Sequence, residues 1–335
     1  MQKIIIIIII SNFLFSYSQK NNNYFEYHKL INKAEYCFLV SKNKDSSLFY
    51  YDKCFNEFDF IFVKDAVNAA QIAYFTKKDY KKYLIKGFEH GLKIEHLKLI
   101  KLFDKEIKKI SDDSFLNEEY LNKRKIYLKT IDLDYLNIIY EYGVQDQIDK
   151  SLYERKEYER KRKIAFSKIE KTIRKRGFPG DKLLGIADST VYKDSKSKLK
   201  DFYKRIEDYD FLKKYFVCGD ELLSQKMIYL LLIHNFCSYN NLDNIWLSEI
   251  KNGNIHPRDV ALIYDNLYRS YSCEKPTIPF KNNLYVNYDK YSTISDKINK
   301  KRKELFMNSL EIDDLKKTFE KEYGFKFFWG FWGCR

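Results

Sequence analysis

Glycine and proline are scarce in this chain of 335 residues, which contains 11 glycines and 4 prolines. A turn-dense all-β fold needs more of both residues, so their scarcity favours long helices. The chain is 45% hydrophobic and 32% charged, which provides enough apolar side chains for a core. The sequence therefore predicts an all-α protein that is long enough for two domains.

No apolar run in the sequence reaches the roughly 20 residues that a membrane-spanning helix needs. At the N-terminus, Lys3 precedes seven isoleucines at positions 4–10, and two polar residues interrupt the apolar stretch that follows. A positive start, a short apolar run and small residues before Gln19 are typical of a secretory signal peptide. An uncleaved anchor is the competing interpretation. We expect residues 1–18 to be a cleaved signal peptide, and the mature protein to be exported to the periplasm or the extracellular space.

Paired cysteine motifs are also missing from the sequence. The six cysteines lie at positions 37, 54, 218, 237, 273 and 334. They form no Cys-x-x-Cys pair and no cysteine–histidine cluster with zinc spacing, and His90 and His96 do not share a helix face. The even number of cysteines and an oxidising compartment allow disulfides, and buried free thiols are the alternative. The sequence thus indicates neither a metal nor a cofactor.

The net charge of +14 is carried mostly by lysine. One interpretation is an acidic partner such as nucleic acid, a polyanionic glycan or an anionic membrane face. However, lysine is abundant together with asparagine, isoleucine, tyrosine and phenylalanine, as in AT-rich genomes, whereas nucleic-acid readers favour arginine. Export also separates the protein from most nucleic acid. We therefore attribute the charge to codon usage and expect no nucleic-acid partner.

Residues 24–103 predict paired amphipathic helices. Two similar segments, one around Ala34 and one around Ala70, are each followed by a turn rich in Lys, Asn and Asp and then by an aromatic helix. The turn residues Asp45 and Asp79 are 34 positions apart. A period near 34 with a small residue facing an aromatic one is typical of helical hairpin repeats.

This segment resembles tetratricopeptide repeats in degenerate form, with Lys78 in place of the usual turn glycine. An irregular helical bundle is the alternative architecture for residues 19–143. A repeat array presents a concave face that suits a protein or peptide, so we expect any partner to bind there. The sequence gives no oligomeric state.

Further helices are predicted from local signals. Asp113 and Asp132 are expected to be N-caps, and Gly143 is expected to end a helix at a domain boundary. Residues 146–176 predict one long helix whose i,i+4 charge pairs indicate a solvated face, ended by Gly177. The remaining predicted helices are a core helix in 221–237, a second in 257–268 and a final helix within 295–323.

Several short motifs occur in order in the second half of the chain. They are Asp146-Gln147, Gly177-Phe178-Pro179, Gly185, His234-Asn235, Gly253-Asn254-Ile255, Ala261 to Asn266, and Arg302. In this order they resemble an uncharacterised bacterial domain family, over roughly residues 140–323. Phe178 stands where the family has Trp, Asn266 stands where it has Arg, and the family's Gln-x-Tyr-Gly-Thr segment is missing. The family has no established activity, so the resemblance implies a helical domain at 144–323 and candidate positions only.

The candidate positions are Asp146, Gln147, His234 and Asp265. A carboxylate can orient a histidine that acts as a general base, but no nucleophile elbow or phosphate loop accompanies them. The structural interpretation is that Asp146 caps the long helix and His234 is a hydrogen-bonded core residue. We therefore expect a non-enzymatic binding or scaffold protein of the cell envelope. The alternative is a divergent hydrolase-like enzyme that uses His234 with Asp146 or Asp265.

The C-terminal tail, residues 324–335, contains six large aromatic side chains. Such a segment is costly to expose to water. Two interpretations remain open: the rings fold back into a groove on the helical domain, or they seat in a membrane interface as a peripheral contact.

Overall fold

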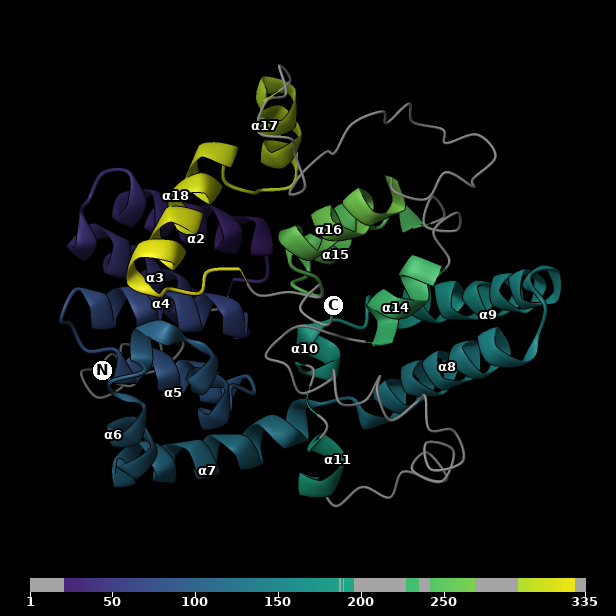
Figure 1. Cartoon of the computed structure of the whole chain (residues 1–335), viewed down its shortest axis with the longest axis horizontal. Coiled ribbons are helices and arrows are strands. Elements are labelled where there is room, and N and C mark those ends of the chain that lie inside the picture. The colour runs from purple at the N-terminus through teal and green to yellow at the C-terminus, as the bar shows by residue number, and fades with distance from the viewer. Residues whose placement is uncertain are drawn as a thin grey trace, which may run out of the picture.

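The structure is a computed structural model that describes residues 21–186, 188, 190–195, 227–234, 242–268 and 295–328. The predicted signal peptide, residues 1–18, lies outside these ranges, as do four of the cysteines; Cys37 and Cys54 are free thiols. Every regular element in the described ranges is helical, which confirms the predicted all-α fold (Figure 1). Within these ranges, no helix has both the length and the apolar character needed to cross a membrane.

Four helices open the described chain: α2 (Tyr24–Leu39), α3 (Lys44–Glu57), α4 (Val63–Phe75) and α5 (Lys81–Glu89). α2 packs against α3, and α4 packs against α5. Asn43 caps α3 by accepting a hydrogen bond from the backbone N–H of Ser46. The turns that follow α2 and α4 share a left-handed residue, Lys42 with φ 54° and Lys77 with φ 57°. Their grouping as tetratricopeptide-type repeats stays a prediction.

The chain continues through η1 (Ile94–Leu99), η2 (Lys101–Phe103), α6 (Ile107–Asp112), α7 (Ser114–Thr130), α8 (Leu133–Leu152) and α9 (Arg155–Arg176). The predicted N-caps are confirmed, because Asp113 accepts from the backbone N–H of Leu116 and Asp132 from that of Tyr135. Gly177, with φ 87°, ends α9 as predicted.

Two predictions for this region were wrong. Gly143 does not end a helix: α8 passes through it, and Gly143 is buried. The single helix expected at 146–176 is instead the end of α8 and the whole of α9, because Tyr153 and Glu154 adopt extended backbone between them. A glycine in a helix interior lowers stability by only about 1 kcal/mol relative to alanine, and tertiary packing can exceed this cost. The domain boundary expected after residue 143 therefore falls within α8.

The second half contains α10 (Asp181–Leu184), α11 (Val191–Asp194), α14 (Met227–His234), α15 (Trp246–Lys251), α16 (Pro257–Tyr268), α17 (Ser295–Glu304) and α18 (Leu310–Tyr323). α16 has the bounds that the sequence predicts, with Pro257 at its first position. The final helix expected within 295–323 is confirmed as α18, and α17 is a further helix in the same range, separated from α18 by a short non-helical segment.

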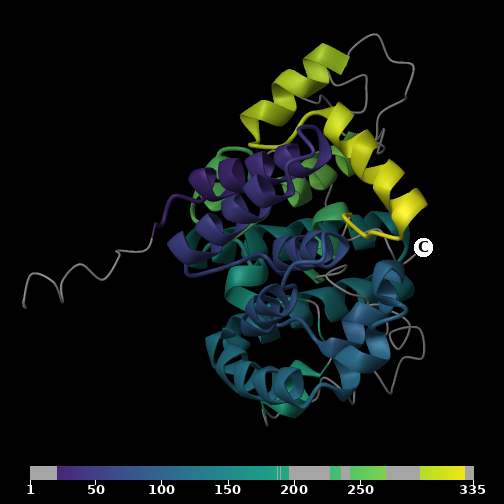
Figure 2. The same ribbon diagram turned by 90° about the vertical axis from the view of Figure 1, so that its left-hand side faces the viewer.

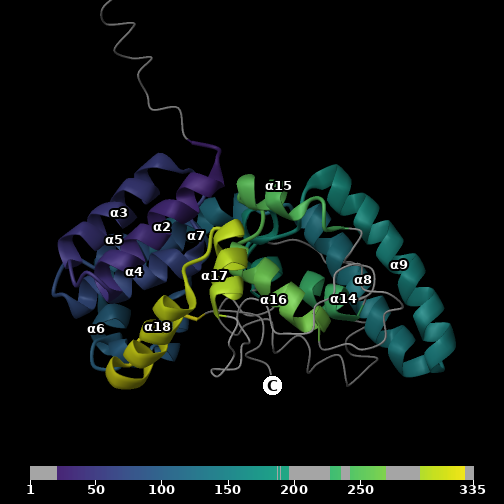
Figure 3. The same ribbon diagram turned by 90° about the horizontal axis from the view of Figure 1, so that it is seen from above.

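The buried apolar residues form two clusters. The first lies mainly among α2–α7, and the second lies among α7–α16. α7 belongs to both clusters, since Leu116 lies in the first and Tyr127 in the second. Seen from above, α2–α6 lie at one end of the molecule and α8 and α9 at the other, with α15, α16 and α17 between them (Figure 3).

The end of the chain returns to the first cluster. Figure 2 shows α18 alongside the N-terminal helices, and the segment after it turns back over them. Phe325 and Phe327 are each only 4% exposed and belong to the first cluster. The described part of the aromatic tail therefore packs onto the N-terminal helices and α18, and residues 329–335 lie outside the described ranges.

Candidate functional site

The sequence-predicted candidates lie on three helices that pack together, because α14 contacts both α8 and α16. Asp146 and Gln147 are buried on α8, and Asp265 is fully buried on α16. Gln147 Nε2 donates to Asp146 Oδ2 at 2.9 Å, and the Tyr158 hydroxyl donates to Asp146 Oδ1 at 3.1 Å. His234 is the last residue of α14, and its side chain lies outside the described residues. The structure thus brings these helices together.

The expected capping role of Asp146 was wrong. Asp146 lies in the interior of α8, well after its first turn, where the backbone N–H groups already bond within the helix. Its carboxylate is instead bonded to side chains on α8 and α9.

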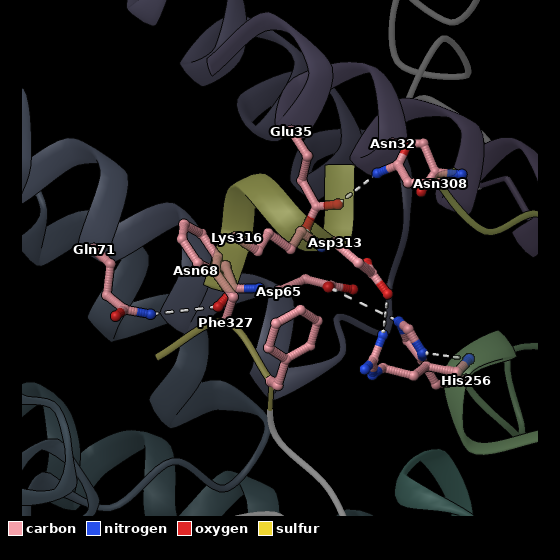
Figure 4. Close-up of polar contacts among 12 residues, drawn as sticks. Asn32, Glu35, Asp65, Asn68, Gln71, His256, Asn308, Asp313, Lys316 and Phe327 are labelled. Atoms are coloured by element: carbon pink, nitrogen blue, oxygen red, sulfur yellow. Dashed lines mark hydrogen bonds and ion pairs between the residues drawn. The ribbon is translucent and has the colours of Figure 1, made fainter. Parts of the chain in front are cut away.

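A second concentration of polar side chains, which sequence reasoning missed, surrounds a small cavity of about 50 Å³. We call it the polar cavity. Its lining comes from α2, α4, the start of α16, the α17–α18 region and the tail (Figure 4). The polar lining residues are His28, Asn32, Glu35, Lys64, Asp65, Asn68, His256, Arg258, Arg302, Asn308, Asp313 and Lys316.

Asp65 is the central carboxyl group of the polar cavity. The Tyr27 hydroxyl donates to Asp65 Oδ2 at 2.9 Å, and Asp65 Oδ1 faces His256 Nε2 at 3.9 Å. Burial, reinforced by the nearby carboxylate of Glu35, raises the pKa of Asp65 to about 7. The Lys64 ammonium opposes this shift. Asp65 therefore exchanges its proton near neutral pH, which is the range in which carboxyl groups serve as acids, bases or proton-linked switches.

The two histidines of the polar cavity are neutral near pH 7. Burial, followed by the charge of Lys64, lowers the pKa of His28 to about 3, and the same two causes hold the pKa of His256 well below its usual range. Nδ1 of His256 accepts a hydrogen bond from the backbone N–H of Arg258 at 3.1 Å, so the ring proton is on Nε2. Nε2 of His28 is buried and has no hydrogen-bond partner among the described residues.

The charged residues around the polar cavity are paired with one another. Lys64 bonds both carboxylate oxygens of Asp259 at 3.1 Å, and Lys316 contacts Glu35 at 2.7 Å. Arg258 and Arg302 both bind Asp313, at 3.0 and 2.8 Å. These pairs connect segments far apart in the sequence, and α4 is joined to α16 in this way.

The tail segment Gly324–Phe328, which we call the C-terminal strap, closes one side of the polar cavity through Phe327 and Phe328. Gln71 of α4 holds the strap by its main chain: Gln71 Oε1 accepts from Lys326 N at 2.7 Å, and Gln71 Nε2 donates to Lys326 O at 2.9 Å. Glu320 Oε1 accepts from the N–H groups of Phe327 and Phe328, at 2.6 and 3.1 Å.

The phenylalanine side chains of the strap pack against other aromatic rings and against Arg258. The Phe325 ring lies 5.2 Å from that of Phe75 and 5.6 Å from that of Phe319, and it stacks on Phe327 at 4.8 Å. The guanidinium of Arg258 lies 4.3 Å from the centre of the Phe328 ring. Aromatic pairs and cation–π contacts of this kind each add about 0.5–1.5 kcal/mol to plain burial.

A wider cleft of about 390 Å³ lies between the two apolar clusters. It is lined by Asp59, Phe60, Glu89, His90, Lys123, Ile126, Tyr127, Thr130, Asp181 and Lys182. Its size suits a small molecule. Lys123 contacts Glu89 at 2.8 Å, and Lys182 donates to the carbonyl oxygen of Asn252 at 2.7 Å, so its main cations already have partners.

One sequence signal could have found the polar cavity and the site that holds the strap. α4 is rich in alanine, yet Lys64, Asn68 and Gln71 recur on one face at spacings of four and three. Every residue from Val63 to Ala73 is buried, so this stripe faces protein instead of solvent. Buried polar residues need partners, and a polar stripe on an otherwise apolar helix therefore indicates a polar site.

In the part of the chain that the structure describes, no group of three or more histidine, cysteine or acidic side chains is arranged to hold a metal ion. In comparisons with known proteins, no family model, curated protein or solved structure matches the chain.

Proposed function

We propose that this is an exported binding protein of the cell envelope whose N-terminal helices hold a peptide segment of another protein. The observation that carries the proposal is the pairing of Gln71 with both main-chain groups of Lys326. An amide side chain that bonds an N–H and a C=O of the same residue recognises a peptide backbone irrespective of its side chain. The protein's own strap shows what such a ligand would look like.

The face around Gln71 has the properties of a peptide site. Gln71 itself is fully buried, and its Nε2 also donates to Asn68 Oδ1 at 3.3 Å, which fixes the orientation of the amide. Phe75 and Phe319 form the walls of the adjacent aromatic pocket. Main-chain hydrogen bonds supply affinity, and pockets for alternate side chains supply specificity, as in other modes of peptide recognition.

The strap also indicates the partner's chemistry. Phe325 packs against Phe75 and Phe319, Phe327 stacks on Phe325, and Lys326 between them is partly exposed. A partner segment with aromatic residues at alternate positions would therefore fit in the same place. In this proposal the strap and the partner compete for one site, so binding requires the strap to leave.

The test uses the full-length chain and a synthetic peptide with the sequence of residues 324–328. Lys326→Pro removes the N–H that donates to Gln71, so it weakens the strap and leaves the receiving residues unchanged. We expect this variant to bind the peptide more tightly than the unmodified chain does, in fluorescence anisotropy. Adding Gln71→Leu should abolish the binding.

The matched control is the same peptide N-methylated at its lysine, which lacks the same donor and should not bind. Circular dichroism and thermal melting establish that each variant is folded. The proposal would be contradicted if a folded Lys326→Pro chain did not bind the unmodified peptide. It would also be contradicted if that chain bound the unmodified and the N-methylated peptide equally well.

The second candidate function is the hydrolase-like activity centred on His234. Its support is the packing of α14 against α8 and α16, which brings the helices of His234, Asp146 and Asp265 together. We expect His234 to be structural, so His234→Ala should lower the melting temperature by several degrees. A fully stable His234→Ala protein that loses a measurable turnover would favour the enzyme instead.

A further inference from the structure

The polar cavity contains hydrogen-bonding groups that the described residues do not satisfy. His28 is only 2% exposed, and its Nε2 has no partner among the described residues. His256 carries its ring proton on Nε2, yet the nearest carboxylate oxygen, on Asp65, is 3.9 Å away, too far for a good hydrogen bond. A buried polar atom without a partner costs about 1–3 kcal/mol. The buried Nε2 of His28 and the Nε2–H of His256 therefore give the polar cavity hydrogen-bonding capacity that a ligand could use.

The charges around the polar cavity argue against an ionic ligand. Each cation in its lining contacts a carboxylate of the protein, in the pairs Lys64–Asp259, Lys316–Glu35 and Arg258/Arg302–Asp313. Breaking a buried pair costs about 3–5 kcal/mol. A cationic ligand would face these ammonium and guanidinium groups, and an anionic one would face Asp65, Glu35 and Asp313. An uncharged ligand leaves every pair intact.

The two histidine nitrogens define the ligand's polar group. The two rings are perpendicular, with their centres 5.1 Å apart, so one small group can reach both. The Nε2–H of His256 needs an acceptor, and a neutral His28 Nε2 can take a donated hydrogen bond or give one. A hydroxyl group both donates and accepts, so it meets these requirements with a single oxygen atom.

We propose that the polar cavity binds an uncharged small molecule through a hydroxyl group that bridges His28 and His256. A site that holds one water molecule needs about 10–15 Å³, so a cavity of about 50 Å³ has room for a hydroxyl or hydroxymethyl group. The rest of the ligand lies at the rim, where Phe306 and Phe328 are partly exposed. Aromatic rings beside hydroxyl-binding groups suit a neutral sugar or polyol.

The experiment titrates the full-length chain with three matched probes: neutral glucose, cationic glucosamine and anionic glucuronate. The imidazole nitrogens are followed by ¹⁵N nuclear magnetic resonance. We expect glucose to shift the Nε2 resonance of His28 in a saturable manner, with an affinity about tenfold or more above that of either charged probe. His28→Leu should remove the binding and raise the melting temperature, because it deletes an unsatisfied buried nitrogen.

The matched control is His96→Leu, because His96 is a buried histidine that lines neither the polar cavity nor the wider cleft. This variant should bind glucose as the unmodified chain does. The proposal is overturned if a charged probe binds as well as glucose, if glucose binding survives in His28→Leu, or if glucose causes no shift and only water fills the cavity. The peptide experiment above uses a weakened strap and a different ligand, so the two proposals fail independently.

Discussion

The carboxyl group of Asp65 should make the stability of the protein depend on pH in a direction opposite to that of most aspartates. Burial raises the pKa of Asp65 to about 7, whereas an unfolded chain holds an aspartate near about 3.9. Between these two values the folded state binds the extra proton, so stability falls as pH rises. The stabilisation that the folded state gains from the Asp65 proton is complete below about pH 4. It is lost as the pH rises through about 7.

Asp65→Asn tests this dependence because asparagine resembles the protonated acid and does not titrate. Its side-chain oxygen can still accept the hydrogen bond from Tyr27. A shift of about three pKa units corresponds to roughly 4 kcal/mol. The variant should therefore match the unmodified chain near pH 4 and be more stable by up to roughly 4 kcal/mol at pH 8.

Urea unfolding at pH 5, 6, 7 and 8 measures the difference between the two proteins. His28 and His256 also have shifted pKa values, lowered by burial, but both proteins contain them and their effects largely cancel in the difference. Asp45→Asn, on an exposed side chain, controls for the loss of one charge. A difference between Asp65→Asn and the unmodified chain that stays constant from pH 5 to pH 8 would refute the reasoning.

Two further predictions follow from local structure, and a third follows from the sequence. Gly180→Ala would place a Cβ atom 1.8 Å from the carbonyl oxygen of Asn254, so we expect a loss of at least about 2 kcal/mol in urea unfolding. Asp132→Ala removes the N-cap of α8 and should cost about 0.5–2 kcal/mol, with reduced helicity in circular dichroism. Mass spectrometry of the native protein should find a mature N-terminus near Gln19, and a cytoplasmic pool with the initiating methionine intact would contradict export.

The helix ends that could be predicted from the sequence are those set by local chemistry. Asp113, Asp132 and Gly177 act within one turn of their own position, and Pro257 fits the first turn of a helix without regard to the rest of the fold. The break between α8 and α9 could not be predicted in this way, because neither residue at the break is glycine or proline. The prediction for Gly143 was wrong because it relied on the low helix propensity of glycine. At a buried position, packing can outweigh that propensity.

The polar cavity could not be predicted because its residues are distant in the sequence. Glu35 bonds Asn308, which is 273 positions away, and Lys64 bonds Asp259, which is 195 positions away. No spacing rule links such pairs. The candidates on α8, α14 and α16 came from a resemblance in motif order. The structure places α14 in contact with α8 and α16. A different group of residues forms the polar cavity.

The strap and the polar cavity share one helix, and this explains why α4 tolerates a buried polar stripe. Asp65 and Asn68 line the polar cavity, and Gln71, less than one further turn along the same helix, bonds the strap. Gln71 also donates to Asn68, and Phe327 of the strap forms part of the cavity wall. A displaced strap would thus remove the main-chain partners of Gln71 and expose the buried groups around Asp65 together. If the proposed peptide site exists, its occupancy and the environment of Asp65 are therefore physically linked through α4, without any change in the helix itself.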